Sequence, residues 1–128
     1  MKKKLYWFRV IRGLFKNWPS IYWSRIIKRS PQILQLRNGI EIEAINPNTI
    51  IPIVAEIWHN KQYGDLKDIK SDNPVIIDIG AHIGIFSLFA LSQVPNATVL
   101  SFEPSKSNAY IAYRNIEMNG FAGGGDSW

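Results

Sequence analysis

The sequence predicts an α/β fold built on part of a doubly wound parallel sheet, with N-terminal helices and a β-hairpin before it. The run Val75–Ile79 is apolar and β-branched apart from Asp78, which is typical of a parallel strand covered on both faces, and a glycine-rich loop follows at 80–84. A second apolar run, Thr98–Phe102, ends in an acid, Glu103, and helical segments follow both runs. This order of elements makes up most of one half of such a sheet.

Residues 1–30 form a basic amphipathic segment for which helices are predicted. They contain nine Lys or Arg and no acid, whereas residues 31–128 contain six basic and ten acidic residues. Because the positive charge is confined to one segment, the net charge of +5 does not indicate a nucleic-acid partner. Apolar residues recur at helical spacing up to a break at Pro19, after which Ser20 is expected to cap a second helix. The apolar residues are Leu5, Phe8, Ile11, Phe15 and Trp18.

Two interpretations of this segment are open. Its apolar stripe packs on the neighbouring domain, which we favour because such a stripe must be buried, or it lies on an anionic membrane surface. No uninterrupted apolar stretch is long enough for a signal peptide or a membrane span. The chain has no Cys, and His59 and His82 are isolated, so no disulfide and no metal site are predicted. The expected location is cytoplasmic, with peripheral contact to the inner face of a membrane under the second interpretation.

A β-hairpin is predicted for residues 32–44 and a helix for residues 49–60. A three-residue loop that ends at Gly39 keeps the apolar side chains of the hairpin on one face, whereas a two-residue loop would mix the faces. The resulting pairs are Leu36 with Ile40 and Leu34 with Ile42. Thr49 or Asn48 is expected to cap the helix. Its apolar face comprises Ile50, Ile53, Val54, Ile57 and Trp58.

A strand–helix–strand–helix unit is predicted for residues 75–120. The glycine loop leads into a helix at 85–92. Ser105 or Ser107 is expected to cap the last helix, and Gly120 stands where a glycine often ends one.

The charges at the two strand ends favour one class of cofactor. Glu103 follows Gly80 by 23 residues, a spacing at which an acid accepts both hydroxyls of an adenosine ribose. A nicotinamide cofactor would need the pattern Gly-x-Gly-x-x-Gly for its pyrophosphate, but His82 stands at the second glycine. Asp78 would repel a pyrophosphate and attract a cation. S-adenosylmethionine (SAM) combines a ribose with a sulfonium and an ammonium, so SAM is predicted and a nicotinamide oxidoreductase is the alternative.

Three spaced motifs make the chain similar to the N-terminal half of FkbM-type class I SAM-dependent methyltransferases. They are Asp78-Ile-Gly80-Ala-His-Ile-Gly84, Ser101-Phe-Glu103-Pro104-Ser105 and Arg114-Asn115-Ile-Glu-Met-Asn119-Gly120. The resemblance implies a Rossmann-like sheet and O-methylation of a small hydroxylated acceptor such as a sugar. It implies that Asp78 and Gly80 border the methionine part of SAM, that Glu103 binds the ribose, and that His82 replaces an Asn usual in the family. The implied cofactor-binding residues are Asp78, Gly80, Ala81, His82, Gly84, Glu103 and Pro104.

We expect two domains, 1–30 and 31–128, the second a truncated methyltransferase domain. The family's sheet continues for several strands, whereas the glycine-rich residues 121–128 are a poor start for a strand. The acceptor site and the catalytic residues are then expected outside the chain, which should be inactive alone and either marginally stable or prone to aggregation. The alternative is a non-catalytic module that docks on a membrane or a partner through residues 1–30. Asp78 and Glu103 opening onto different surfaces would contradict the cofactor prediction.

Overall fold

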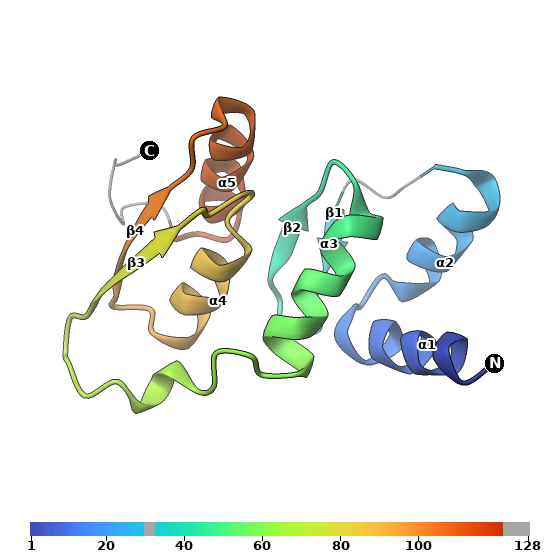
Figure 1. Cartoon of the computed structure of the whole chain (residues 1–128), viewed down its shortest axis with the longest axis horizontal. Helices are drawn as coiled ribbons and strands as arrows, with labels where there is room; N and C mark the ends of the chain where they lie inside the picture. Colours follow the sequence, from blue (N-terminus) through green and yellow to red (C-terminus); the bar gives the residue numbers. More distant parts are fainter. Residues whose placement is uncertain (30–32, 122–128) are drawn as a thin grey trace. The chain divides into compact units, whose positions relative to one another are not determined.

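The chain divides into two compact units, unit 1 (Met1–Asn60) and unit 2 (Lys61–Trp128). The computed structural model describes residues 1–29 and 33–121 (Figure 1). The predicted first residue of the hairpin, Gln32, and the glycine-rich end beyond residue 121 lie outside the described residues. The predicted division into domains after residue 30 remains a prediction.

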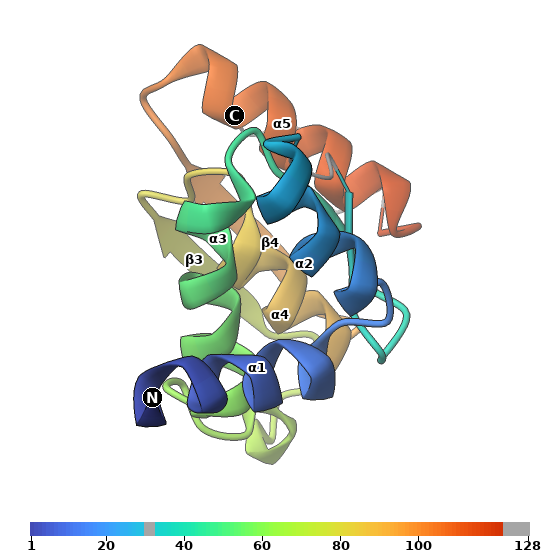
Figure 2. The same cartoon turned by 90° about the vertical axis from the view of Figure 1, so that its right-hand side faces the viewer.

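Unit 1 combines three helices with one hairpin. Its elements are α1 (Lys2–Leu14), α2 (Trp18–Ile27), β1 (Ile33–Gln35), β2 (Glu41–Glu43) and α3 (Pro47–Val54). A π-helical turn, η1 (Ala55–His59), continues α3. Figure 2 shows α1 running across this end of α3, where the ring centroids of Tyr6 and His59 lie 6.4 Å apart. Every element contributes to the core, whose fully buried side chains include Ile11, Phe15, Ile21, Leu34, Ile42 and Val54.

The hairpin has the predicted register and loop. Strands β1 and β2 are antiparallel, with Leu34 opposite Ile42. The Leu36 N–H donates to the Ile40 carbonyl at 2.8 Å, which closes a three-residue loop. Gly39 at the end of the loop has a φ of +92°, a conformation that glycine adopts without a steric cost. The alternation of apolar side chains therefore identified the correct pairing.

The helix starts differ from the predictions because proline occupies the first turn of both helices. Proline needs no N–H there, and its fixed φ suits the start of a helix. In α2 this residue is Pro19, so Ser20 lies inside the helix and is not its cap. In α3 the cap is Asn46, whose side chain accepts from the Asn48 N–H at 3.2 Å, and not Thr49 or Asn48 itself.

Helical spacing identified the buried faces only in part. Ile11 and Phe15 are fully buried, but Leu5 at the start of the same stripe is half exposed. In α3, Ile53 is exposed and Ile51 is buried in its place. None of the helices in the described ranges is both long and apolar enough to cross a lipid bilayer.

Unit 2 contains a parallel pair of strands and two longer helices. Its elements are η2 (Leu66–Asp68), β3 (Val75–Ile79), α4 (Ile85–Gln93), β4 (Thr98–Phe102) and α5 (Lys106–Met118). The strands pair in register from Val75 opposite Thr98 to Ile79 opposite Phe102. As predicted, Ser105 caps α5, accepting from the Asn108 N–H at 3.4 Å, and Gly120 follows the helix with a φ of +76°. Figure 1 shows the two strands side by side with α4 against them.

The prediction that β3 is covered on both faces is wrong for the described residues. Asp78 faces inward and is buried, but the opposite side chains of Val75, Ile77 and Ile79 are 63, 58 and 84% exposed. The hairpin forms a separate sheet and does not pair with β3. The observed architecture is a mixed α/β fold with a two-stranded parallel sheet, compatible with part of a Rossmann-like fold. The doubly wound arrangement remains a prediction.

Candidate functional site

The glycine loop after β3 is shaped by three residues with left-handed backbone. Gly80, His82 and Gly84 have φ values of 76°, 51° and 82°. The N–H groups of Gly80 and Ala81 both donate to the carbonyl of Phe102, at 2.8 and 3.1 Å. The loop is thereby fixed to the end of β4. Histidine, like asparagine, adopts this backbone conformation more readily than most residues, so His82 is compatible with the turn.

Glu103 joins the end of β4 to this loop. One carboxylate oxygen accepts from the His82 N–H at 2.8 Å, and the other accepts from the Ser105 N–H at 2.9 Å. The bonds from Ser105 and then His82 lower the pKa of Glu103, because both favour the charged form. A carboxylate oxygen can accept more than one hydrogen bond, so both oxygens retain acceptor capacity. Glu103 is therefore an ionised, positioned acceptor at the strand ends.

Asp78 lies on the covered side of β3 and faces α4. It accepts from the Ser87 hydroxyl at 2.6 Å, and Ser87 lies 2.8 Å from the Ser101 hydroxyl on β4. Ser101 is the partner of Asp78 in the parallel register. Desolvation raises the pKa of Asp78, and the bonds from Ser87 partly offset this increase. The three side chains form a small polar cluster between the strands and α4.

Two contacts with α5 hold the glycine loop in place. Gly84 lies so close to α5 that a Cβ placed on it would be 3.2 Å from the Cβ of Ala112. The buried Asn115 side chain donates to the carbonyl of Ile83 at 2.9 Å. The path of the loop thus depends on two features: the absence of a side chain at Gly84, and the side-chain amide of Asn115 on the helix. One sign of this role is visible in the sequence, because Asn115 is polar within the apolar face that contains Ile111 and Ile116.

The structure brings four of the predicted residues together through hydrogen bonds at the strand ends. They are Gly80 and Ala81, which both bond Phe102, and His82 and Glu103, which bond each other. Pro104 follows Glu103 and is exposed. The described contacts of Asp78 lead to Ser87 and not to Glu103, so the joint binding of one ligand by Asp78 and Glu103 remains a prediction.

Two residues outside the predicted set lie beside the start of α4. The rings of Tyr63 and Phe86 are in contact, with centroids 4.6 Å apart. Tyr63 is 48% exposed, and Phe86 is the second residue of α4. From the sequence, Tyr63 is expected in the connection before β3, where Tyr63-Gly64 also resembles the segment that precedes this strand in the family. In the described residues, no group of three or more His, Cys, Asp or Glu is arranged to hold a metal ion.

Similarity to curated proteins is confined to part of each chain, and no family model matches the sequence. Methyltransferase sdnD from Sordaria araneosa is 39% identical over 67 residues, which is 52% of this chain and 25% of that protein. Methyltransferase 1 from Beauveria bassiana is 35% identical over 68 residues, 53% of this chain and 26% of that protein. The 31-O-demethyl-FK506 methyltransferase FkbM from Streptomyces tacrolimicus is 32% identical over 74 residues, 58% of this chain and 28% of that protein.

The chain therefore matches about a quarter of the length of these curated relatives. All three carry the name methyltransferase, which supports a methyltransferase function.

Proposed function

We propose that unit 2 binds SAM and forms the cofactor-binding part of a methyltransferase. Its acceptor is a small hydroxylated molecule, such as a sugar or another natural product, and the methyl group goes to oxygen. The observation that supports this most directly is the carboxylate of Glu103 at the end of β4, whose charged form is favoured by the backbone N–H groups of Ser105 and of His82 in the glycine loop. The methyltransferase names of the similar proteins support the class of reaction.

The residues at the strand ends suit an adenosyl ligand. Glu103 offers two acceptor oxygens, which match the two hydroxyls of a ribose. No atom lies within 4 Å of the position where a Cβ on Gly80 would be, so a ligand can approach the backbone there. Asp78 acts indirectly in this proposal, because its bond to Ser87 fixes β3 against α4. Direct contact with the cationic part of SAM would require its carboxylate to leave Ser87.

SAM, when bound, supplies an electrophilic methyl group. The residues of this chain bind and orient the cofactor, and orientation is a large part of catalysis in such a displacement. Glu103 holds the ribose, and Asn115 and Gly84 keep the loop in the shape that places Glu103 and His82 together. None of the described residues is assigned as the base that removes the acceptor proton.

Calorimetric titration of the 128-residue chain tests the proposal with S-adenosylhomocysteine, the demethylated product of SAM. We expect one molecule to bind per chain. Glu103→Gln should weaken binding by about 10-fold or more, since hydrogen bonds to charged groups contribute about 1.5–3 kcal/mol. Glu117→Gln is the matched control, because Glu117 is an exposed acid on α5, where its carboxylate accepts from the Tyr113 hydroxyl at 3.5 Å.

A ligand that lacks the ribose 2′-hydroxyl tests whether Glu103 contacts the ribose directly or whether its substitution only disturbs the glycine loop. The unmodified chain should bind the 2′-deoxy analogue more weakly than the parent compound, whereas Glu103→Gln should bind both equally. A similar loss in both proteins would show that Glu103 does not contact the ribose. Failure to bind S-adenosylhomocysteine, together with binding of NADH, would replace the proposal with the oxidoreductase alternative.

A further inference from the structure

Unit 1 contains two adjoining hollows between α1, α2 and the start of α3. The larger has a volume of about 580 Å³ and the smaller about 340 Å³. Both are lined by Arg25, Asn48 and Ile51, so they form one continuous groove. The larger hollow alone has the size of a typical small-molecule site.

The lining of the groove is apolar and cationic. Trp7, Ile51 and Pro52 line the larger hollow. Lys3 and Lys4 also line it, and Lys28 lines the smaller one, while Arg25 lies between the two. Among the described residues, none of the side chains that line either hollow is acidic. The described lining therefore offers apolar contact and positive charge together.

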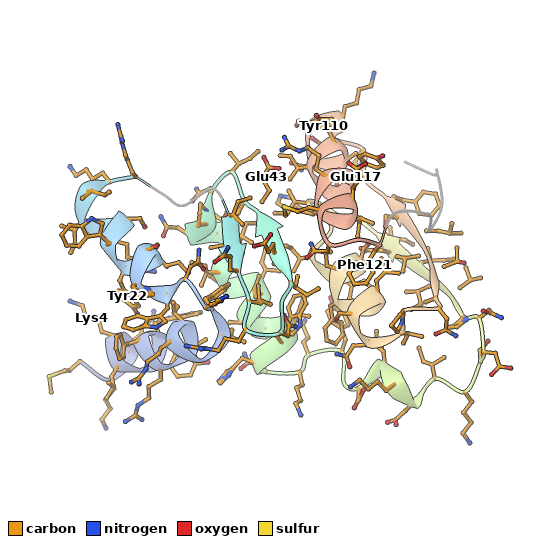
Figure 3. All side chains as sticks on the ribbon, turned by 180° about the vertical axis from the view of Figure 1, so that it is seen from behind. Lys4, Tyr22, Glu43, Tyr110, Glu117 and Phe121 are labelled. Atoms are coloured by element: carbon orange, nitrogen blue, oxygen red, sulfur yellow. The ribbon has the colours of Figure 1, made fainter. Side chains whose placement is uncertain are left out.

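The basic residues are placed by the helices and not scattered over the surface. Arg25 lies in the last turn of α2, and Lys28 is the residue that ends the helix, with a φ of +53°. The Arg25 guanidinium lies over the ring of Tyr22, 5.3 Å from its centroid, and Tyr22 also lines the larger hollow. Figure 3 labels Tyr22 on α2 and Lys4 on α1, which approach the groove from different helices.

Helix stability does not account for the lysines on α1. Lys3 and Lys4 stand in the first turn, which contains no acid. The N-terminal end of a helix is the positive end of its dipole, so cations there are unfavourable by some tenths of a kcal/mol each. An anion bound at Arg25, which lines the same hollow as Lys3 and Lys4, would reduce that repulsion.

We propose that this groove binds one molecule of an anionic amphiphile with a phosphate monoester head and an alkyl tail. The phosphate lies at Arg25 and Lys28, where a guanidinium can donate two hydrogen bonds to its oxygens. The tail lies in the larger hollow against Trp7, Ile51 and Pro52. This inference concerns unit 1 alone and does not depend on the cofactor proposed for unit 2.

The occupant is a single molecule and not the surface of a bilayer. The most exposed apolar residues of α2 are Trp23, Ile26 and Ile27. At 100° per residue, these point away from the side of α2 that carries Ile21 and Arg25. A flat membrane that contacts Trp23 would therefore not fill the groove. A single amphiphile and the headgroups of a membrane present the same phosphate chemistry, so an experiment must distinguish these two ligands.

Dodecyl phosphate, used below its critical micelle concentration, is the probe for titration of the 128-residue chain. We expect binding of one molecule per chain. Inorganic phosphate and the uncharged dodecyl maltoside should each bind at least about 10-fold more weakly, because each lacks one of the two interactions. Equal binding of inorganic phosphate would overturn the role of the apolar wall, and equal binding of the maltoside would overturn the role of the charge.

Paired variants locate the site. Arg25→Gln should weaken binding of dodecyl phosphate by about 10-fold or more. Arg9→Gln removes the same charge from α1 at an exposed position outside both linings, and it should leave binding unchanged. Asn48→Trp keeps the net charge but fills the groove where the hollows meet, and it should abolish binding while the melting temperature stays unchanged.

Two outcomes would overturn the proposal. One is an equal loss for Arg25→Gln and Arg9→Gln, which would indicate attraction to overall charge. The other is binding to phosphatidylglycerol vesicles that Asn48→Trp does not affect, without binding of monomeric dodecyl phosphate. That result would assign the basic segment to a membrane surface instead.

Discussion

The two units bury their strands to different extents. In unit 1, the apolar residues Leu34 and Ile42 face the core and are fully buried, and three of the four strand residues beside them are polar: Gln35, Glu41 and Glu43. In unit 2, β3 is also covered on one face only, but its sequence does not alternate, so Ile77 and its apolar neighbours on that face are exposed. The hairpin sequence matches its surroundings, whereas β3 carries an apolar face that the described residues leave uncovered.

This difference shows that an apolar run indicates that a strand is suited to burial. It does not indicate which segment, if any, covers the strand. Exposure of three large β-branched side chains forfeits a favourable contribution of about 1.5–3 kcal/mol for each one. The expected low stability or aggregation of the chain is consistent with that loss and remains a prediction.

The largest effect on the free energy of unfolding is expected when the same change, Ile to Ala, is compared between a strand of unit 1 and a strand of unit 2. Ile42→Ala should lower the free energy of unfolding by about 2–5 kcal/mol, since it leaves a cavity in the core of unit 1. Ile77→Ala removes the same atoms from an exposed face and should cost less than about 1 kcal/mol. Urea unfolding, followed at backbone amides of each unit by NMR, measures both changes. Equal costs would mean that the outer face of β3 is covered in solution.

A smaller effect on the free energy of unfolding is expected from glycine substitutions in the loop of unit 2, where Gly84 is packed against α5 and Gly80 faces open space. Gly84→Ala introduces strain at a φ of 82° and a contact with Ala112, so it should cost about 2–4 kcal/mol. Gly80→Ala, with a similar φ of 76° but open space around it, should cost only about 1–2 kcal/mol. Thermal melts of the two variants give the comparison. A larger loss for Gly80→Ala would contradict the packing assigned to Gly84.

The smallest effect is a pH dependence of opposite sign at the two carboxylates. The raised pKa of Asp78 means that its contribution to stability is present below its unfolded-state pKa and is lost as pH rises through the folded-state value. The lowered pKa of Glu103 means that its contribution is present above the unfolded-state pKa and is lost as pH falls through the folded-state value.

Urea unfolding between about pH 3 and pH 7 tests these signs, since ordinary carboxyl groups titrate in this range. The stability of the unmodified chain relative to Asp78→Asn should fall as pH rises, whereas its stability relative to Glu103→Gln should fall as pH decreases. Asn at position 78 can still accept from the Ser87 hydroxyl, so the comparison isolates the charge. Curves that move in the same direction would contradict the assigned environments.

Local patterns predicted the elements whose determinants lie close together in the sequence. The register of Leu34 with Ile42 followed from alternation, and the cap at Ser105 and the glycine at position 120 followed from residue type. The caps at Ser20 and Thr49 were wrong because a proline moved the first turn of each helix upstream.

The candidate site was predictable in its residues but not in their orientations. Spacing along the chain brought Glu103 to the glycine loop, and the structure adds the bond to His82. The turn of Asp78 toward Ser87 depends on how α4 sits against the strands, which no local pattern contains. Asn115 contacts Ile83 across 32 positions in the sequence, and a single polar residue in an apolar face does not name such a distant partner.

The bond from the His82 N–H to the Glu103 carboxylate has a practical consequence. Donation of an amide proton to a carboxylate shifts its resonance downfield in a proton spectrum, and the shift depends on the charge of the acceptor. A ribose that draws electron density from the same carboxylate would move this signal, and protonation of Glu103 would move it back toward the bulk of the spectrum. The amide resonances of His82 and Ser105, which both donate to this carboxylate, therefore report occupancy without a label on the ligand.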